Sequence, residues 1–136
     1  MTRILITGSN SGFGKLAALS FARQGHSVVA TMRTLEKGDD LRATVETEGL
    51  PIEIRRLDVT DAASVAEGVG DPAELDAVVN NAGFEAWGAL ELIDDGLWTR
   101  QLDTNVLGPM RVIRHVLPTW RERGSGTIVN VSSIAG

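Results

Sequence analysis

Short apolar runs alternate with amphipathic runs along the whole chain, and this alternation restricts the possible folds more than any other feature of the sequence. The amphipathic runs have the three- and four-residue apolar spacing of helices. The apolar runs have the length and β-branched content of strands and cover residues 3–7, 26–33, 52–59, 75–83 and 127–131. This order predicts an α/β fold with five strands in a parallel sheet and helices on both faces. Right-handed crossovers make such a sheet doubly wound and Rossmann-like.

The expected helices cover residues 14–25, 39–49, 62–69 and 94–123. Gly25 is expected to close the first helix, and either Thr60 or Asp61 to cap the third. Gly108-Pro109 is expected to bend the long fourth helix, because proline cannot donate to the preceding turn. Apolar residues recur along that helix at Trp98, Leu102, Val106, Met110, Ile113, Leu117 and Trp120. With no repeat or linker in the sequence, residues 1–136 are expected to form a single domain.

Composition excludes several classes of partner. The formal net charge of -5 argues against nucleic acid or an anionic membrane as the main partner, because both need a basic face. There is no cysteine, so neither a disulfide framework nor a thiolate zinc site is expected, and two histidines far apart make no metal site. No signal peptide or membrane span is readable, and a reducing, cytoplasmic location is expected.

A glycine-rich segment, "TGSNSGFG", lies between the first strand and the first helix. Gly8 allows a sharp turn, Gly12 leaves room for a pyrophosphate, and Gly14 lets the helix pack against the strand. The spacing G-x-x-x-G-x-G differs from the common G-x-G-x-x-G fingerprint, and the alternative is a tight loop without a ligand. Its position in a βαβ unit, with free N–H groups at the helix start, favours a dinucleotide site. The residues assigned to that site are Thr7, Gly8, Ser9, Asn10, Ser11, Gly12, Phe13 and Gly14.

The end of the second strand indicates which dinucleotide is bound. NAD(H) sites carry an acidic residue about 20 positions past the loop, where it binds the ribose 2′-hydroxyl. Here the chain reads Thr31-Met32-Arg33, and Arg33 offers a permanently charged donor fork. We therefore expect NADP(H) to be preferred over NAD(H). The alternative is that Arg33 is a solvated loop residue.

Three further polar signals lie at strand ends or within the long helix. Asp58 and Val59 close the third strand, Asn80-Asn81-Ala82-Gly83 closes the fourth, and Asn105 lies within a helical pattern that asparagine disfavours. Each has an ordinary explanation on its own: a turn aspartate, an Asx-rich loop, or an asparagine that bonds its own backbone.

Taken together, these motifs resemble the short-chain dehydrogenase/reductase family, and the likeness covers all 136 residues as that family's N-terminal cofactor-binding portion. The family's pattern is T-G-x-x-x-G-x-G, an aspartate after the third strand, N-N-A-G, a mid-helix asparagine, and a serine that opens S-x-x-G. Ser133 and Gly136 match its last element. The segments "SGFG", "VVATMRTLEKG" and "LPTWRERGSGTIV" resemble the branch of 17β-hydroxysteroid and retinol dehydrogenases.

The resemblance implies an NADP(H)-dependent oxidoreductase that transfers hydride to or from small alcohol or carbonyl substrates. In that family, Asp58 would bond the adenine, and the segment from Asn80 to Gly83 would brace the sheet beside the cofactor. The implied catalytic residues are Ser133, which would hold the substrate oxygen, and Asn105, which would anchor a water relay.

The family's acid/base is a tyrosine with a lysine four residues later, about a dozen residues beyond the serine. This sequence contains no tyrosine and ends three residues after Ser133. We therefore expect a portion truncated before the family's last two strands and inactive alone. The alternative is a non-catalytic nucleotide-binding module, or a half-protein completed by another chain. An open sheet edge and an apolar helix side also favour a homo-oligomer.

Overall fold

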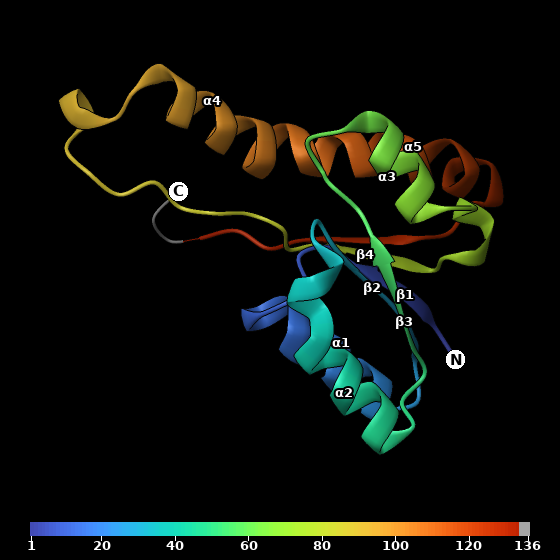
Figure 1. The fold of residues 1–136 in the computed structure, drawn as a ribbon. Helices are drawn as coiled ribbons and strands as arrows, with labels where there is room; N and C mark the ends of the chain where they lie inside the picture. Colours follow the sequence, from blue (N-terminus) through green and yellow to red (C-terminus); the bar gives the residue numbers. More distant parts are fainter. Residues whose placement is uncertain (134–136) are drawn as a thin grey trace.

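The computed structural model describes residues 1–133, so Gly136 of the S-x-x-G match lies outside the described residues. Five strands form one sheet in the order β3-β2-β1-β4-β5, and every pairing is parallel (Figure 1). The order changes direction between β1 and β4, as the doubly wound prediction requires, and the expected fold class is confirmed. The strands are β1 (Arg3–Ile6), β2 (Ser27–Met32), β3 (Ile52–Arg56), β4 (Ala77–Asn80) and β5 (Thr127–Asn130).

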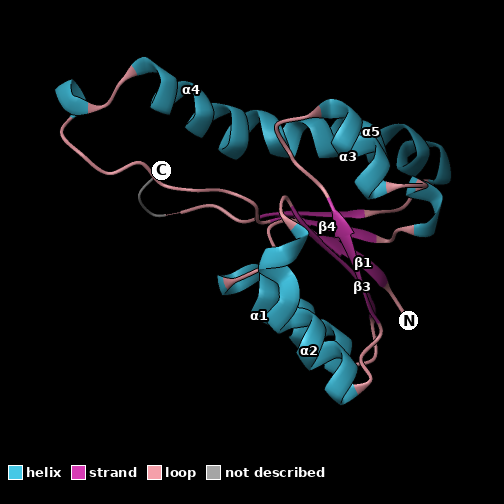
Figure 2. Cartoon of the chain, in the orientation of Figure 1, coloured by secondary structure: helices cyan, strands magenta, loops and turns pink. Residues whose placement is uncertain are grey.

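Helices cover both faces of the sheet (Figure 2). One face carries α1 (Gly12–Arg23) and α2 (Asp39–Glu48), and the other carries α3 (Ala62–Val69) and α5 (Gly108–Arg123). The helix α4 (Asp95–Leu102) continues the line of α5 beyond the sheet. Short helical turns are η1 (Leu35–Gly38), η2 (Pro72–Glu74), η3 (Leu90–Leu92) and η4 (Asp103–Leu107). Among residues 1–133, none of these helices combines the length and apolarity that crossing a membrane requires.

The sheet separates two hydrophobic clusters, because successive side chains of a strand point to opposite faces. Ile4 and Ile6 of β1 belong to the cluster beneath α1 and α2, whereas Leu5 between them belongs to the cluster beneath α3 and α5. Leu5 and Ile6 are fully buried. Such continuous burial on both faces is typical of central parallel strands and explains why these runs read as unbroken apolar segments.

The long helix expected over residues 94–123 is interrupted. The chain forms α4, then a π-helical turn at η4, and then α5. Pro109 lies in the first turn of α5, where a missing N–H costs little, so the irregularity precedes Gly108-Pro109 and does not fall on it. Gly108 also lets the helix pass close to the loop after β3, because a Cβ there would lie 2.8 Å from Cγ2 of Val59.

The apolar positions of this segment divide between the core and the surface. The side chains of α5 that enter the core are Val112, Val116 and Trp120. Only Trp120 of these belongs to the expected stripe, whereas Trp98 and Leu102 of that stripe are exposed. The Trp120 indole donates to the Pro72 carbonyl (3.0 Å), and a Cβ at Gly126 would lie 2.3 Å from its ring. The stripe predicted from the sequence is therefore mostly a surface feature.

Two of the expected helix ends are confirmed in detail. Asp61, not Thr60, caps α3, because its Oδ1 accepts from the backbone N–H groups of Ala63 (2.9 Å) and Ser64 (3.4 Å). Gly25 follows the end of α1 with φ +89°, the left-handed conformation that glycine adopts without strain.

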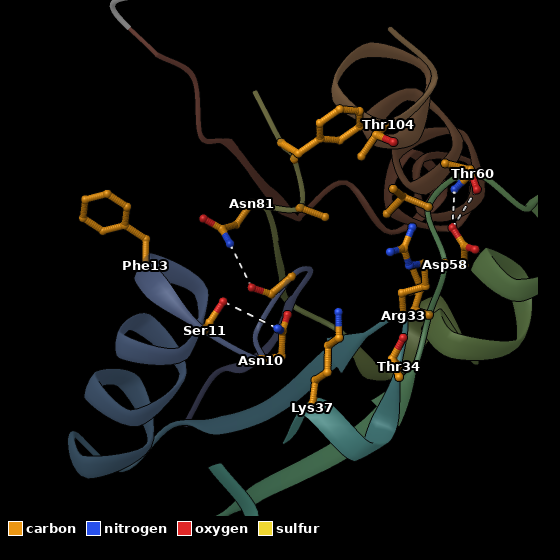
Figure 3. Close-up of a pocket in the computed structure, with 16 residues that line it drawn as sticks. Asn10, Ser11, Phe13, Arg33, Thr34, Lys37, Asp58, Thr60, Asn81 and Thr104 are labelled. Atoms are coloured by element: carbon orange, nitrogen blue, oxygen red, sulfur yellow. Dashed lines mark hydrogen bonds between the residues drawn. The ribbon is translucent and has the colours of Figure 1, made fainter. Parts of the chain in front are cut away.

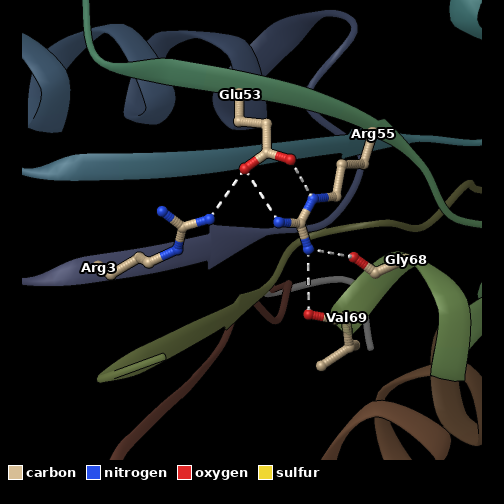
Figure 4. Close-up of polar contacts among 5 residues, drawn as sticks. All are labelled: Arg3, Glu53, Arg55, Gly68 and Val69. Atoms are coloured by element: carbon tan, nitrogen blue, oxygen red, sulfur yellow. Dashed lines mark hydrogen bonds and ion pairs between the residues drawn. The ribbon is translucent and has the colours of Figure 1, made fainter. Parts of the chain in front are cut away.

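An ion-pair network pins the edge strand β3 to its neighbours (Figure 4). Glu53 accepts from Arg55 through both oxygens (2.6 and 2.9 Å) and from Arg3 of β1 (2.8 Å). Arg55 also donates to the carbonyls of Gly68 and Val69 at the end of α3 (3.3 Å each). The hydrogen bonds from Arg55 lower the pKa of Glu53, partial burial opposes this, and the charges of Arg55 and Arg3 lower the pKa further. The network thus joins β1, β3 and α3.

Candidate cofactor site at the carboxyl ends of the strands

A cavity of about 400 Å³ opens at the carboxyl ends of the strands, on either side of the point where the strand order reverses (Figure 3). The loops after β1, β2, β3 and β4 form most of its wall, and η4 adds one residue. Such a crevice is where open α/β sheets bind ligands. The lining residues are Gly8, Asn10, Ser11, Phe13, Arg33, Thr34, Lys37, Leu57, Asp58, Val59, Thr60, Asn81, Ala82, Gly83, Phe84 and Thr104.

The three glycines of the loop after β1 have different structural roles. A Cβ at Gly8 would lie 2.8 Å from Cα of Ala82, and one at Gly14 would lie 2.2 Å from the Gly8 carbonyl oxygen. Both positions therefore need glycine for close backbone approach. Gly12 has φ +56°, and a Cβ there would meet no atom within 4 Å. Open space at the start of α1, next to free N–H groups, is what an anionic ligand needs.

A hydrogen-bonded link joins this loop to the loop after β4. The buried hydroxyl of Thr7 accepts from the backbone N–H groups of Asn81 and Ala82 (3.0 Å each). In return, Nδ2 of Asn81 donates to the carbonyls of Thr7 (3.2 Å) and Gly8 (3.1 Å). Thr7, which is expected to bind cofactor, does not line the cavity; its buried side chain fixes the two loops to each other.

Two more of the expected binding residues lie behind the cavity wall. Ser9 is fully buried and donates to the Ile6 carbonyl (2.8 Å). Asn80 is 3% exposed and donates to Oδ1 of Asn130 (2.9 Å), which ties β4 to β5. Gly12 and Gly14 are also absent from the cavity lining, whereas the other expected residues of the loops after β1 to β4 line it.

Asp58 faces the cavity with one carboxylate oxygen already engaged. Its Oδ1 accepts from the Thr60 N–H (3.0 Å) and hydroxyl (2.7 Å), and no described residue donates to Oδ2. Partial burial raises the pKa of Asp58, but the hydrogen bonds from Thr60 and the charges of Arg33 and Arg56 outweigh it and hold the pKa below its usual value. Asp58 is therefore an ionised acceptor at neutral pH, suited to an amino or hydroxyl donor.

A basic wall stands beside Asp58. Arg33 follows β2 directly, and Thr34 and Lys37 come from the turn that begins η1 (Figure 3). Sequence reasoning found Arg33 but missed Lys37 and Thr34, because nothing in the local pattern predicted the short helical turn that directs them into the cavity. A second cation only four residues after Arg33 is the signal that could have found Lys37.

Asn105 lies in the π-helical turn and bonds a distant loop. Its Oδ1 accepts from the Phe84 N–H (3.0 Å), and its Nδ2 donates to the Phe84 carbonyl (2.8 Å). This pairing excludes the alternative that Asn105 bonds its own helix. Asn105 does not line the cavity, although its neighbour Thr104 does. π-helical turns inside α-helices are frequent at functional sites.

An ion pair between Arg111 and Asp103 holds this π-helical turn in place, and the sequence pattern did not predict it. Nη2 of Arg111 donates to Oδ1 of Asp103 (2.6 Å), and its Nη1 donates to the Val59 carbonyl (3.0 Å). Arg111 therefore connects α5 to η4 and to the loop after β3, and the last two contribute Thr104 and Val59 to the cavity wall.

Ser133 is not among the residues that line this cavity; it is exposed and lies three residues beyond the end of β5. Its neighbour Ser132 lines a second, apolar cavity of about 530 Å³ between α1 and the ends of β4 and β5. Phe13 and Asn81 line both cavities, and the other residues of the second are Leu16, Ala17, Ser20, Val79 and Val131.

Comparison with known proteins agrees with this arrangement. The uncharacterised oxidoreductase YusZ of Bacillus subtilis is 40% identical over 137 residues, which cover 97% of this chain and 49% of that protein. Retinol dehydrogenase 8 of Bos taurus is 39% identical over 98% of this chain and 45% of its own length. A closed form of serine dehydrogenase complexed with NADP+ superimposes with a TM-score of 0.87 at 35% identity, covering 98% of this chain and 55% of that one.

The chain thus spans about half the length of the relatives it matches. The model of one family, described as short chain dehydrogenase, matches residues 2–136. The sheet order, the glycine loop and the cavity at the strand ends are those that the motifs implied. The chain therefore belongs to the short-chain dehydrogenase/reductase family.

Proposed function

We propose that this chain is the cofactor-binding portion of an NADP(H)-dependent oxidoreductase that interconverts small alcohols and carbonyl compounds by hydride transfer. The observation that carries the proposal is the single cavity that joins the glycine loop, Asp58 and Arg33. A dinucleotide needs an anion site, an adenine acceptor and a group that reads the ribose, and these three elements supply them.

The cavity and the helix start beside it have distinct roles in this proposal. The pyrophosphate is held by the first N–H groups of α1, next to the open space at Gly12 that adjoins the cavity-lining residues Ser11 and Phe13. The free oxygen of Asp58 accepts from the adenine amino group, and Arg33 binds the 2′-phosphate through its guanidinium fork. The bound nicotinamide supplies or accepts the hydride. The serine dehydrogenase structure with NADP+ supports the cofactor class as a family precedent.

Catalysis needs more than the cofactor site. Ser133 would hold the substrate oxygen, and Asn105 would help to order water near it. Hydride transfer to a carbonyl leaves an alkoxide that needs a proton, and neither serine nor asparagine is an acid of matched pKa. The sequence has no tyrosine for this task. We therefore expect the 136 residues alone to show no turnover at an enzymatic rate.

The second candidate is a nucleotide-binding module without catalysis. The observation that favours it is that Ser133 is not among the residues that line the cavity. Both candidates require cofactor binding, so binding tests the shared part of the proposal and turnover separates the two.

Calorimetric titration with NADP+ and NAD+ tests the cofactor assignment. The unsubstituted chain is expected to bind NADP+ more tightly, and Arg33→Ala to lower that preference about tenfold, because a charge-assisted pair is lost. Arg121→Ala, which removes a charge from the last turn of α5, is the matched control and should leave the preference unchanged. Equal affinity of the unsubstituted chain for both cofactors would contradict the assignment.

Turnover is measured as NADPH oxidation with a panel of ketones and aldehydes. An added C-terminal fragment that carries Y-x-x-x-K, taken from a relative, is expected to restore activity if the chain is half of an enzyme. General acid/base assistance is worth about 10² to 10⁴ in rate, so rescue should be easy to detect. Robust turnover by the 136 residues alone would show that another group supplies the proton.

A further inference from the structure

We propose that Lys37 is a second, specificity-determining ligand for the 2′-phosphate, beside Arg33. The inference rests on the proposed function, and it assigns to Lys37 a role that the sequence motifs do not.

The short turn η1 is fixed so that Lys37 faces the cavity. Gly38 is buried against the end of β2, and a Cβ there would lie 2.4 Å from Sδ of Met32. The Lys37 N–H donates to the Thr34 carbonyl (3.2 Å), which closes the turn. The Lys37 side chain rises from this turn toward the same space as Arg33 and Thr34 (Figure 3).

The acidic residues that follow Lys37 are occupied elsewhere. Asp39 pairs with Arg42, and Asp40 pairs with Lys15 of α1. No ion pair or hydrogen bond joins the Lys37 ammonium to any residue between 1 and 133. Lys37 is exposed and lines the cavity, so its ammonium can pair with an anionic group of a ligand bound there.

The two cations of the wall are not equivalent. Arg33 lies near Asp58, and the negative charge of that carboxylate partly balances the positive charge of Arg33 when no ligand is bound. Lys37 has no such competitor among the described residues, so its charge is available to the ligand in full. A 2′-phosphate carries about −1.5 to −2 charges near neutral pH, more than one guanidinium can balance. The ribose hydroxyl of NAD(H) offers Lys37 no charge to pair with.

Chemistry therefore assigns different tasks to the two residues. The planar fork of Arg33 orients the phosphate, and the compact ammonium of Lys37 supplies charge to whichever oxygen is nearest. The Thr34 hydroxyl can donate to a third oxygen. Removing Lys37 should weaken binding of 2′-phosphorylated ligands and leave their 2′-hydroxyl counterparts unaffected.

The test uses two probes that differ only at this group: adenosine 2′,5′-bisphosphate and adenosine 5′-monophosphate. Calorimetry on the full chain is expected to show about three- to tenfold weaker binding of the bisphosphate to Lys37→Ala, with monophosphate binding within twofold. Lys37→Arg should restore most of the affinity, because the charge is kept. Lys37→Gln removes the charge but keeps a long polar side chain, so it repeats the test if the alanine variant misfolds. Arg121→Ala is the control for a general loss of positive charge.

The outcomes separate this inference from the proposed function. If the unsubstituted chain favours the bisphosphate and Lys37→Ala and Lys37→Gln both keep that preference, the role of Lys37 is refuted and the proposed function stands. An equal loss for both probes would also refute it, because Lys37 would then act on the shared 5′-phosphate. If the unsubstituted chain shows no preference, the NADP(H) proposal itself fails.

Discussion

Gly12 and Gly14 are two residues apart, yet glycine is needed at each for a different reason. At Gly14 the need is space, because a Cβ would overlap the Gly8 carbonyl oxygen at 2.2 Å and the Asn81 amide at 2.6 Å. At Gly12 the need is conformation, because φ is +56° and no neighbour stands in the way. Side chains in this left-handed region cost about 1–2 kcal/mol.

The alanine variants should therefore separate stability from binding. Gly14→Ala is expected to lower the free energy of unfolding by about 3 kcal/mol or more, because backbone must move to admit the methyl group. Gly12→Ala is expected to cost about 1–2 kcal/mol and to weaken NADP+ binding in the folded protein. Urea unfolding and calorimetry check the two effects. Equal stability of the two variants would contradict this assignment.

The limits of sequence reasoning are clearest at single residues. The close packing at Gly14 and the placement of Asp58 at the mouth of the sheet could be predicted, because turn geometry and the end of a strand are local properties. Thr7 was assigned to the cofactor, yet its hydroxyl accepts from Asn81, 74 residues away. Lys37 was missed because its direction depends on how η1 packs on Met32. Contacts between distant segments carry no local signature, so these assignments required the structure.

At the scale of elements, the prediction of fold was reliable where periodicity was strong. All five strands and the first three helices lie within a few residues of their expected positions. The long helix was the exception, because a π-helical turn keeps the apolar spacing of an α-helix while changing which face it presents. The packing of Arg111 against Asp103 and the Val59 carbonyl fixes that turn, and no spacing rule predicts it.

The ion-pair network at β3 predicts that the stability of the fold depends on pH. Because the folded pKa of Glu53 is below its ordinary value of 4.5, its ionised form stabilises the fold above that pH, and the contribution is lost as pH falls through the folded pKa. Glu53 is 48% exposed, so solvent screening limits this contribution to about 0.5 kcal/mol.

Arg55→Ala is expected to lower the free energy of unfolding by about 1–2 kcal/mol at pH 7. The variant loses the ion pair with Glu53 and also the donor to the last carbonyls of α3. The difference in the free energy of unfolding between this variant and the unsubstituted chain should become smaller as the pH falls from 5 to 3. Urea midpoints across this range measure it, with Arg121→Ala as the reference for a removed charge. A difference that stays constant with pH would show that Glu53 takes no part.

At the scale of the whole molecule, the two edges of the described sheet differ in character. The β3 edge carries Glu53, Arg55 and Arg56, and charged side chains on an edge discourage pairing with other chains. The β5 edge is apolar and exposed at Val129, and Val131 just beyond it borders the apolar cavity. Trp98, Leu102 and Val106 add a second exposed apolar surface on α4 and η4, although Ile113, expected beside them, is half-buried.

We expect the 136-residue chain to self-associate through one of these surfaces. Sedimentation at micromolar concentration should show species larger than the 14.5 kDa monomer. Val129→Lys should reduce association if the β5 edge is used, and Leu102→Lys if the helix surface is used. A stable monomer throughout the concentration range would disprove the expectation.

The link between Thr7 and the loop after β4 has a consequence for biosynthesis. The unit formed by β1, α1 and β2 is synthesised before the loop after β4 and contains most of one hydrophobic cluster. Its nucleotide loop, however, lacks the N–H donors of Asn81 and Ala82 until those residues are made. At about 5–20 residues per second, the delay is about 4–15 seconds. Because α5 and β5 follow Asn81 and Ala82 in the chain, the link between the two loops can form before the sheet and its second helical layer are complete.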